Sequence, residues 1–432
     1  MAITVIASLS CIASFLHTTG DHVRNWDNGG GGAAALRSLR TLLTANNREH
    51  SIKTAPLTPL ANFTGFHNHI AHQLVAMYRL GANATALQRQ YAVAGRAYGP
   101  PLPSRGRVNI TNWERQIGEC GCGLLSGRTD EEYSDYVSFY AAQVEQRGVN
   151  ATLLAYWPRL AAGLVGDIFH AVIQLGYAFE GTGRGSTAPA GSSILLEELV
   201  AQGLAWSSAA YATLPMPTAG YRSAAPLVVL QALHDDPHPF PHYTGEDEGT
   251  CYPHGDDPHG NVCFNDAVED LIANHSAVLM RYELAPSSLR PADAFAQLCR
   301  AALVVFAAGG YNDFYLLHLM TGSRAVWALA TLSGLPWAEI TLHDMLRALW
   351  RAMLYVYVVK RRPSIAPAPV LTPPWRPWRS LQAAALLFPE EPHLAKLVLT
   401  CADFHARWND DLYWQTAERA VALFEAGGKF EH

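Results

Sequence analysis

The chain has 432 residues, of which 49% are hydrophobic and 16% are charged, so it is long and apolar enough to bury a large core. Its formal net charge is −6, and its lysines and arginines are scattered without forming a basic stripe. Nucleic-acid binding is therefore not expected. Beyond the N-terminus, charges and turn residues interrupt every apolar run before it reaches the roughly 18 residues of a membrane helix, so we predict no membrane span.

Residues 1–35 are expected to form a flexible or signal-like N-terminus. This segment begins with the apolar run MAITVIASLSCIASFL and ends with GGGGAAA, a composition typical of flexible linkers. A secretory signal normally carries a positive charge before its apolar stretch, and none precedes this run. The seven cysteines are irregularly spaced, which favours reduced thiols over a Cys251–Cys263 bridge. We therefore favour a cytoplasmic location, with secretion as the alternative.

Apolar residues recur with a helical period along most of residues 36–432, and few segments alternate as a strand would. An acidic, histidine-rich loop at 234–263 and a proline-rich segment at 363–378 interrupt this pattern. We therefore predict an all-α fold, a single large multi-helix domain with long loops. The expected helices cover residues 36–43, 66–80, 84–94, 131–146, 150–164, 166–181, 192–213, 266–284, 292–308, 312–332 and 338–360, and two or three more close the chain.

Histidines occupy inward positions in several of these helices. In FHNHIAHQLVAMYRLGA, His69 lies on the apolar stripe, between His67 and His72. A neutral imidazole in a core needs a partner for each nitrogen, which a side chain or a metal ion can provide. Each such histidine is therefore either a hydrogen-bonded core residue or a ligand in a shared metal site. The histidines among apolar neighbours on separate helices are His69, His170, His275 and His318.

Several segments resemble motifs of the questin oxidase-like family, and they occur in the family's order over most of the chain. These segments are FHNHIAH at 66–72, NITNWERQIG at 109–118, DYVSFYAAQVEQRG at 135–148, LLAYWPRLAAGLVGDIFHAVIQLGYAFE at 153–180, LAWSSAAY at 204–211, FYLLHLMTGSRAV at 314–326 and AMLYVYVVKRRP at 352–363.

The resemblance implies a tailoring oxidoreductase of aromatic polyketide pathways. Its substrates would be O₂ and a small polycyclic aromatic such as an anthraquinone, oxidised or opened by Baeyer–Villiger-like or dioxygenase chemistry. Some family members hold non-haem iron with four histidines and a carboxylated lysine. The residues implied here as ligands of Fe(II) are His69, His170, His275 and His318.

The family's lysine falls at Leu349, which cannot bind a metal. This departure leaves open whether the chain holds iron with histidines alone, holds another metal or holds none. It also motivates an alternative from another class, a catalytically silent helical protein that binds an aromatic small molecule.

The remaining expectations concern the surroundings of the metal. His67 and His72 are candidates for proton transfer at the pocket rim, and a helix-capping or surface histidine is the alternative for each. Gln174 stands where some family members have a second histidine, and it could bind a substrate carbonyl or orient His170. Aromatic side chains could form a flat slot for the substrate, although packing in the core is the alternative. The expected substrate-binding residues are Gln174, Tyr177, Tyr311, Phe314 and Tyr315.

Other cofactor motifs are missing from the sequence. No GxGxxG motif follows a strand, and we find no P-loop, GxSxG elbow or HExxH. We therefore expect no bound flavin, and any reductant, such as NADPH, would come from outside the chain. The histidine spacings of the 234–263 loop fit no standard zinc pattern, so we expect a surface lid or insertion there, with metal binding as the alternative. The sequence leaves the oligomeric state open.

Overall fold

A computed structural model of the chain describes residues 32–52, 67–117, 129–179, 196–215, 225–242, 264–284, 290–365 and 375–431. Within these ranges every regular element is a helix and no strand forms, which confirms the predicted all-α, single-domain fold. Cys299 and Cys401 are buried free thiols. The expected N-terminal segment as far as residue 31, the Cys251–Cys263 pair, most of the acidic loop and the centre of the proline-rich segment lie outside the described residues.

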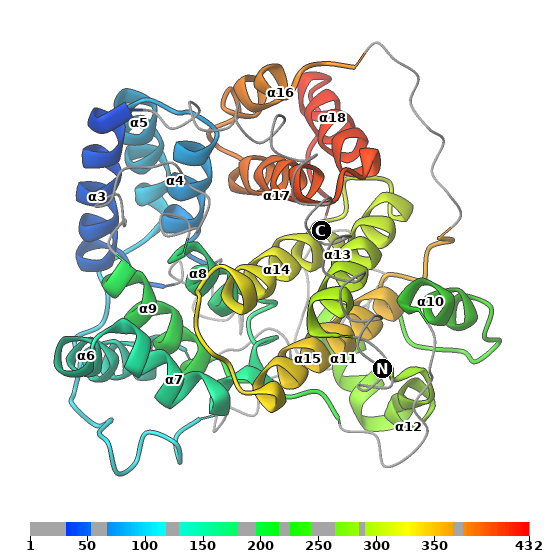
Figure 1. Cartoon of the computed structure of the whole chain (residues 1–432), viewed down its shortest axis with the longest axis horizontal. Coiled ribbons are helices and arrows are strands. Elements are labelled where there is room, and N and C mark those ends of the chain that lie inside the picture. The colour runs from blue at the N-terminus through cyan, green and yellow to red at the C-terminus, as the bar shows by residue number, and fades with distance from the viewer. Residues whose placement is uncertain are drawn as a thin grey trace, which may run out of the picture.

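The first helices form a layer at one side of the molecule, in blue in Figure 1. They are α3 (Gly32–Glu49), α4 (Ile70–Arg79) and α5 (Ala84–Ala94), and each packs on the other two. Helix α5 has the predicted bounds because the Asn83 side chain caps its start, accepting a hydrogen bond from the Ala86 backbone amide.

A second group contains α6 (Thr129–Arg147), α7 (Val149–Leu160) and α9 (Leu196–Ala209), with α8 (His170–Tyr177) packed against α9. The helix expected from residue 150 begins one residue earlier, directly after Gly148, whose φ of 78° ends α6. It ends at Leu160, before the expected residue 164, and contains Pro158.

The C-terminal half supplies the remaining helices, and Figure 1 shows α14 near the middle of the molecule. Helix α10 occupies a stretch for which the sequence predicts no element. The expected helix at 266–284 is divided by a π-helical turn at 271–275. The bounds are α10 (Pro226–His234), α11 (Phe264–Asp270), α12 (Ser276–Leu279), α13 (Pro291–Ala308), α14 (Phe314–Thr331), α15 (Glu339–Val359), α16 (Trp378–Ala385), α17 (Pro392–Trp408) and α18 (Asp411–Glu425).

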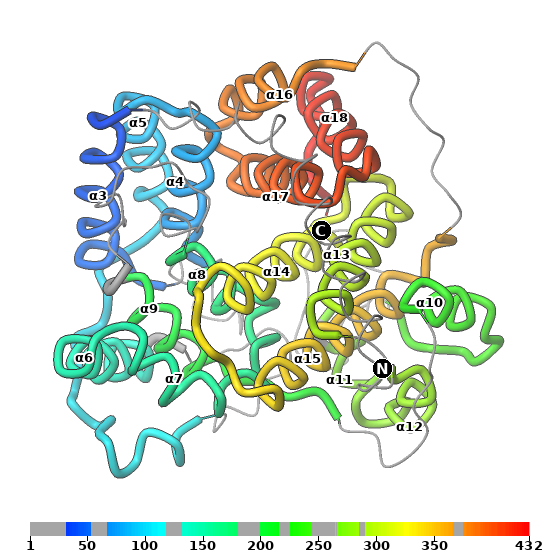
Figure 2. The backbone as a smooth tube through the Cα atoms, in the orientation of Figure 1, coloured from blue at the N-terminus to red at the C-terminus, as the bar shows by residue number. Residues whose placement is uncertain are grey.

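Four helices from distant parts of the sequence close into a ring. Helix α4 packs on α8, α8 on α14, α14 on α17, and α17 on α4 again. The backbone trace in Figure 2 shows how the chain returns α17, near its end, to the side of α4, near its beginning. A ring of facing helices is a common place for ligand and metal sites, because inward side chains from several helices meet there.

Glycines allow the ring helices to approach closely. A Cβ atom on Gly176 of α8 would lie 2.7 Å from the Ala325 Cα of α14, and one on Gly322 would lie 2.6 Å from the Phe169 ring. Before α8, a Cβ on Gly166 would lie 1.5 Å from the Ala210 carbonyl oxygen. The small residues near the histidines therefore serve helix packing.

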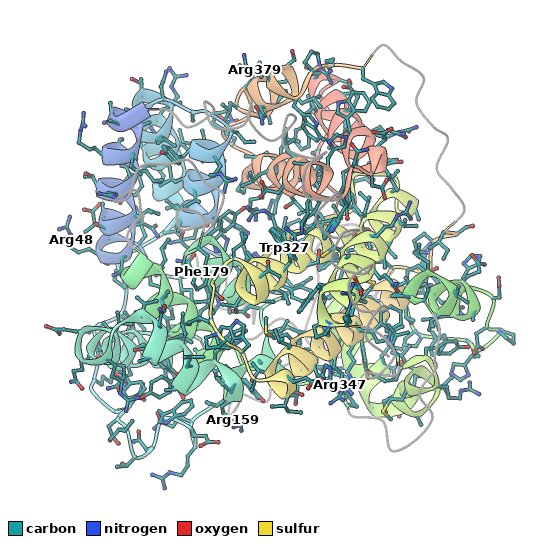
Figure 3. The ribbon with its side chains drawn as sticks, in the orientation of Figure 1. Arg48, Arg159, Phe179, Trp327, Arg347 and Arg379 are labelled. Carbon is teal, nitrogen blue, oxygen red and sulfur yellow. The ribbon has the colours of Figure 1, made fainter. Side chains whose placement is uncertain are left out.

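Side chains fill the space between the helices. In Figure 3, Phe179 and Trp327 lie among packed side chains, whereas Arg48, Arg159 and Arg379 lie toward the outside. Helix α13 is long and apolar enough to cross a membrane by composition alone, but half of its length is buried inside the fold. Core helices share these properties, so the absence of a membrane span stays a prediction.

Candidate metal centre

Four buried histidines meet inside the helix ring, one from each helix. Their ligand atoms all lie within 4.8 Å of one another. His69 is the N-cap residue of α4, His170 begins α8, His318 lies in the first part of α14, and His393 is the second residue of α17. The site thus combines residues from both ends of the chain.

Three of these imidazoles are oriented by hydrogen bonds from their Nδ1 atoms. His170 Nδ1 lies 2.5 Å from the Asp167 carbonyl oxygen, and His318 Nδ1 lies 2.8 Å from the Phe314 carbonyl oxygen. His393 Nδ1 lies 2.6 Å from Glu391 Oε1. Because these oxygens can only accept, each Nδ1 carries the proton and each Nε2 presents a lone pair. This arrangement is typical of histidines that bind metals through Nε2.

The environment keeps His69, His72 and His170 neutral. Burial lowers the pKa of His69 and His72 well below the ordinary value, and the charge of Lys396 adds to this effect. Burial also lowers the pKa of His170, with a further contribution from His67. Neutral imidazole is the form that binds a metal ion, so these groups need not lose a proton first.

Lys396 is a second unusual feature of α17. It is fully buried three residues after His393, and no described residue accepts a hydrogen bond from its Nζ atom. Burial lowers the pKa of Lys396 to about 7, although the Glu391 carboxylate partly opposes this shift. A substantial fraction of the amine is therefore neutral near pH 7, and a neutral lysine amine is a nucleophile.

A tight turn before α8 connects the histidine group to its neighbours. Asp167, Ile168 and Phe169 have φ values of 50°, 44° and 70°, a left-handed conformation that is uncommon for residues other than glycine. The Asp167 carboxylate accepts a 2.7 Å hydrogen bond from Trp206 Nε1 and lies 3.4 Å from His67 Nε2. Asp167 thus orients His170 through its carbonyl and contacts His67 through its carboxylate.

His67 and His72, the expected proton-transfer residues, flank the group in different ways. The His67 ring stacks on the His170 ring at a centroid distance of 4.0 Å, and its side chain is 12% exposed. The His72 ring is fully buried and stacks on Tyr177 at 5.7 Å. His67 is therefore better placed than His72 to exchange protons with solvent.

The structure brings together three of the four expected ligands, and it corrects the fourth. His275 ends the π-helical turn, where its Nδ1 lies 2.9 Å from His238 Nε2 and its Nε2 lies 3.8 Å from Asp270. It is not part of the histidine group, in which His393 is the fourth member. His275 has apolar neighbours in the sequence, as the histidines of the ring do. The sequence pattern therefore does not reveal that His275 lies on an interrupted helix outside the ring.

The structure also sets Leu349, the expected lysine position, apart from the histidine group. Leu349 is fully buried in α15, which is not one of the four ring helices. Lys396 lies instead beside the histidines. Apart from burial itself, the charge of Lys396 has the largest effect on the pKa of His69. The sequence does contain a signal for this residue, because in PHLAKLVLT a lysine occupies the apolar stripe one turn after a histidine. Lysine is almost never fully buried without a specific reason.

The expected aromatic slot is only partly assembled. Phe314 lies against His318 and His393, with centroid distances of 4.5 Å and 4.9 Å. Tyr177 packs on His72 and lies beneath the Arg324 guanidinium.

The other expected substrate-binding residues lie in different surroundings. Tyr315 stacks on Phe264 at 3.7 Å, and Tyr311 lies beneath Arg419. Gln174 donates a 2.7 Å hydrogen bond to Gln202. These contacts leave the substrate-binding roles of Tyr311, Tyr315 and Gln174 as predictions.

The donor set fits a transition-metal ion. Four neutral imidazoles suit Fe(II), and also zinc or copper. The hydrogen bond from His393 to the Glu391 carboxylate is the support that metal-binding histidines usually have. The buried group can therefore hold a metal ion, whose identity is left to experiment.

Comparison with known proteins gives the family. The family model of questin oxidase-like proteins matches residues 66–401. The chain belongs to the questin oxidase-like family. The match confirms the resemblance indicated by the sequence motifs, and it extends into α17 far enough to include His393 and Lys396.

Two curated relatives resemble parts of the chain. Oxidoreductase AflY of Aspergillus parasiticus is 30% identical over 123 residues, which is 27% of this chain and 24% of the relative. Baeyer-Villiger oxidase AgnL3 of Paecilomyces divaricatus is 27% identical over 156 residues, which is 34% of this chain and 31% of the relative. The aligned regions thus span about a quarter to a third of these relatives. The questin oxidase-like family and both relatives bear the names of oxidases or oxidoreductases.

Proposed function

We propose that the chain is an oxidoreductase that uses O₂ to oxidise or open a ring of a polycyclic aromatic polyketide, such as an anthraquinone. The observation that carries the proposal is the group of four buried histidines, three of which have their proton fixed on Nδ1. Membership of the questin oxidase-like family and the names of the two relatives support the reaction class.

In this proposal, Fe(II) is held by the four histidines together with a carboxylated Lys396. Carboxylation joins the neutral Lys396 amine to the carbon of CO₂, forms an N–C bond and releases one proton. The product is a carbamate, whose oxygens are metal ligands and whose negative charge offsets part of the charge of the ion. When bound, the ion supplies the capacity to activate O₂ in a site shielded from water.

The other residues of the chain position and protect the reactants. Phe314 covers His318 and His393 with apolar surface, and Tyr177 covers the neighbouring His72, which limits the entry of water. His67, held by Asp167 and partly exposed, transfers a proton between the substrate hydroxyl and solvent.

The electron balance distinguishes two forms of the reaction. In a Baeyer–Villiger-like reaction, one oxygen atom enters the ring and the other becomes water, with two electrons from an external reductant such as NADPH. In a dioxygenase reaction, both atoms enter the product and no reductant is consumed. The mass of the product formed under ¹⁸O₂ tells the two apart.

The test is O₂ uptake by protein loaded anaerobically with Fe(II) and given a hydroxylated anthraquinone. We expect uptake by the wild type, loss of uptake in His318→Ala, and normal uptake in His343→Ala, a control on α15 outside the group. Tight binding of the aromatic without O₂ uptake would favour the catalytically silent alternative.

A further inference from the structure

His69 is held in the histidine group differently from the other three histidines. The rings of His170, His318 and His393 are each oriented by a hydrogen bond at Nδ1. Among the described residues, none forms a hydrogen bond with His69 Nδ1. A ligand that is not oriented through its second ring nitrogen depends on its backbone to direct the ring. The support for His69 therefore lies in the backbone from which its side chain extends.

The residue before His69 is a buried asparagine whose side-chain amide is fully used. Asn68 is only 6% exposed. Its Oδ1 accepts a 2.9 Å hydrogen bond from the Ile70 amide at the start of α4, and its Nδ2 donates to Asn46 Oδ1 at 3.1 Å and to the Ser51 carbonyl at 2.9 Å. No other side chain of this length offers two donors and an acceptor at one position.

Backbone hydrogen bonds complete the attachment of this segment. The Asn68 amide donates to the Ile52 carbonyl at 2.7 Å, and the Tyr98 hydroxyl donates to the His67 carbonyl at 2.7 Å. Asn46 lies on α3, which packs on α4 and stands beside it in Figure 1. The segment that carries His67 is thus fixed to α3, to the residues after α3 and to Tyr98, all of which lie outside the helix ring.

Capping of α4 alone does not require this arrangement. A short acceptor side chain such as serine is sufficient to satisfy an amide in the first turn of a helix. The two hydrogen bonds from Asn68 Nδ2 run instead away from α4, toward Asn46 and Ser51. They fix the backbone at the point where α4 begins, and so they set the direction in which His69 extends.

We propose that Asn68 is a positioning residue of the metal centre, which anchors the start of α4 to Asn46 and Ser51 and thereby directs His69 toward the other three histidines. This inference rests on the metal centre of the proposed function. Asn68 acts through His69 and not on the reacting atoms. Its hydrogen bonds provide for His69 what the Nδ1 hydrogen bonds provide for the other members of the group.

The test measures binding of Co(II), whose visible absorption reports the number and arrangement of its ligands. Asn68→Ser keeps an acceptor for the Ile70 amide but is too short to reach Asn46, so it separates capping from anchoring. Asn46→Ala removes an acceptor at the other end of the same hydrogen bond. The controls are Asn47→Ala, at the neighbouring residue of α3, and Asn83→Ala, at the cap of α5.

We expect Asn68→Ser and Asn46→Ala to weaken Co(II) binding about 10- to 100-fold, the usual effect of losing the support of a metal ligand. The absorption of their cobalt complexes should approach that of His69→Ala, a change that a general loss of stability does not produce. Asn47→Ala should match wild type in both measurements. Asn83→Ala should unfold at a lower urea concentration, because a helix cap is lost, yet bind Co(II) within about twofold of wild type.

Unchanged affinity and absorption in Asn68→Ser and Asn46→Ala would overturn the inference. An equal loss of affinity in Asn83→Ala, or failure of wild type to bind Co(II), would overturn it as well. The O₂ uptake of iron-loaded protein separates this inference from the proposed function. Co(II) binding that depends on Asn68, without O₂ uptake by wild type, would contradict the proposed function and leave the inference standing. O₂ uptake by wild type, with unchanged Co(II) binding in both variants, would overturn the inference alone.

Discussion

The Nε2 atoms of His69 and His170 lie 2.7 Å apart, although 101 residues separate them in the sequence. The Asp167 carbonyl fixes the proton of His170 on Nδ1, so His170 Nε2 is an acceptor. Without a metal, His69 Nε2 must then donate to it. In the metal-bound form both Nε2 atoms would present lone pairs to the ion, so neutral His69 would change tautomer and carry its proton on Nδ1.

Replacing the carboxylate that orients His393 should weaken metal binding. Glu391 Oε1 accepts the Nδ1 proton of His393, so Glu391→Gln removes the charge that makes this imidazole a stronger donor. We expect about a 10- to 100-fold loss of metal affinity, measured by competition with a chelator. The exposed neighbour variant Glu390→Gln should match wild type, and equal affinities in both variants would refute a role for Glu391.

A carbamate on Lys396 should be directly detectable. Protein equilibrated with ¹³C-bicarbonate and a divalent metal should show a carbamate carbon signal by NMR, because the neutral fraction of the Lys396 amine can add to CO₂. Lys396→Arg keeps the positive charge but cannot form this group at neutral pH, so the signal and most of the bound metal should disappear. Lys360→Arg, at a lysine paired with Asp313, is the control. A signal that persists in Lys396→Arg would place the carbamate elsewhere.

The left-handed turn before α8 predicts different effects of two substitutions at Asp167. Asparagine tolerates the left-handed conformation and can still accept the hydrogen bond from Trp206, so Asp167→Asn should lower the free energy of unfolding by about 1 kcal/mol or less. Asp167→Ala adds conformational strain and leaves the Trp206 N–H without its acceptor, so a loss of about 3 kcal/mol is expected. Urea denaturation gives both values, and equal losses would contradict this account of the turn.

The hydrogen bonds around Asp135 lead to a prediction of how the free energy of unfolding depends on pH. Burial raises the pKa of this carboxyl, but hydrogen bonds from Arg107, Ser104 and the backbone amides of Arg105 and Gly106 outweigh burial and lower it overall. A carboxyl with a lowered pKa stabilises the fold above its unfolded-state pKa of about 3.9, and this contribution disappears as the pH falls further.

Asp135→Asn should therefore be less stable than wild type by about 2 kcal/mol between pH 5 and pH 7, and the difference should shrink below about pH 4. Denaturation curves at several pH values test this expectation. A difference that stays constant down to pH 3 would show that the charge of Asp135 contributes nothing.

The sequence predicts helix positions well where local signals coincide with the packing. Helix α5 has its predicted bounds because the Asn83 cap and the apolar period agree. Helix α8 is shorter than the expected 166–181, since the left-handed φ values of Asp167, Ile168 and Phe169 depend on tertiary contacts with α9 and α14. An apolar pattern contains no information about such a turn.

The apolar pattern also predicts the residues of the candidate site only in part. His69, His170 and His318 lie on strongly apolar helices, and the ring unites them as the sequence suggested. His275 has similar neighbours in the sequence, but the π-helical turn leaves it beside His238. His393 follows the polar stretch PEEP and has no apolar flank on that side, so periodicity alone does not single it out.

The most direct test of this account is the metal content of three purified proteins after anaerobic loading with Fe(II), measured by mass spectrometry. We predict near-stoichiometric metal in wild type and in His275→Ala, and loss of metal in His393→Ala, because only His393 belongs to the buried group. Metal retained in His393→Ala and lost in His275→Ala would contradict the account. It would place the metal at the His238–His275 pair instead of inside the helix ring.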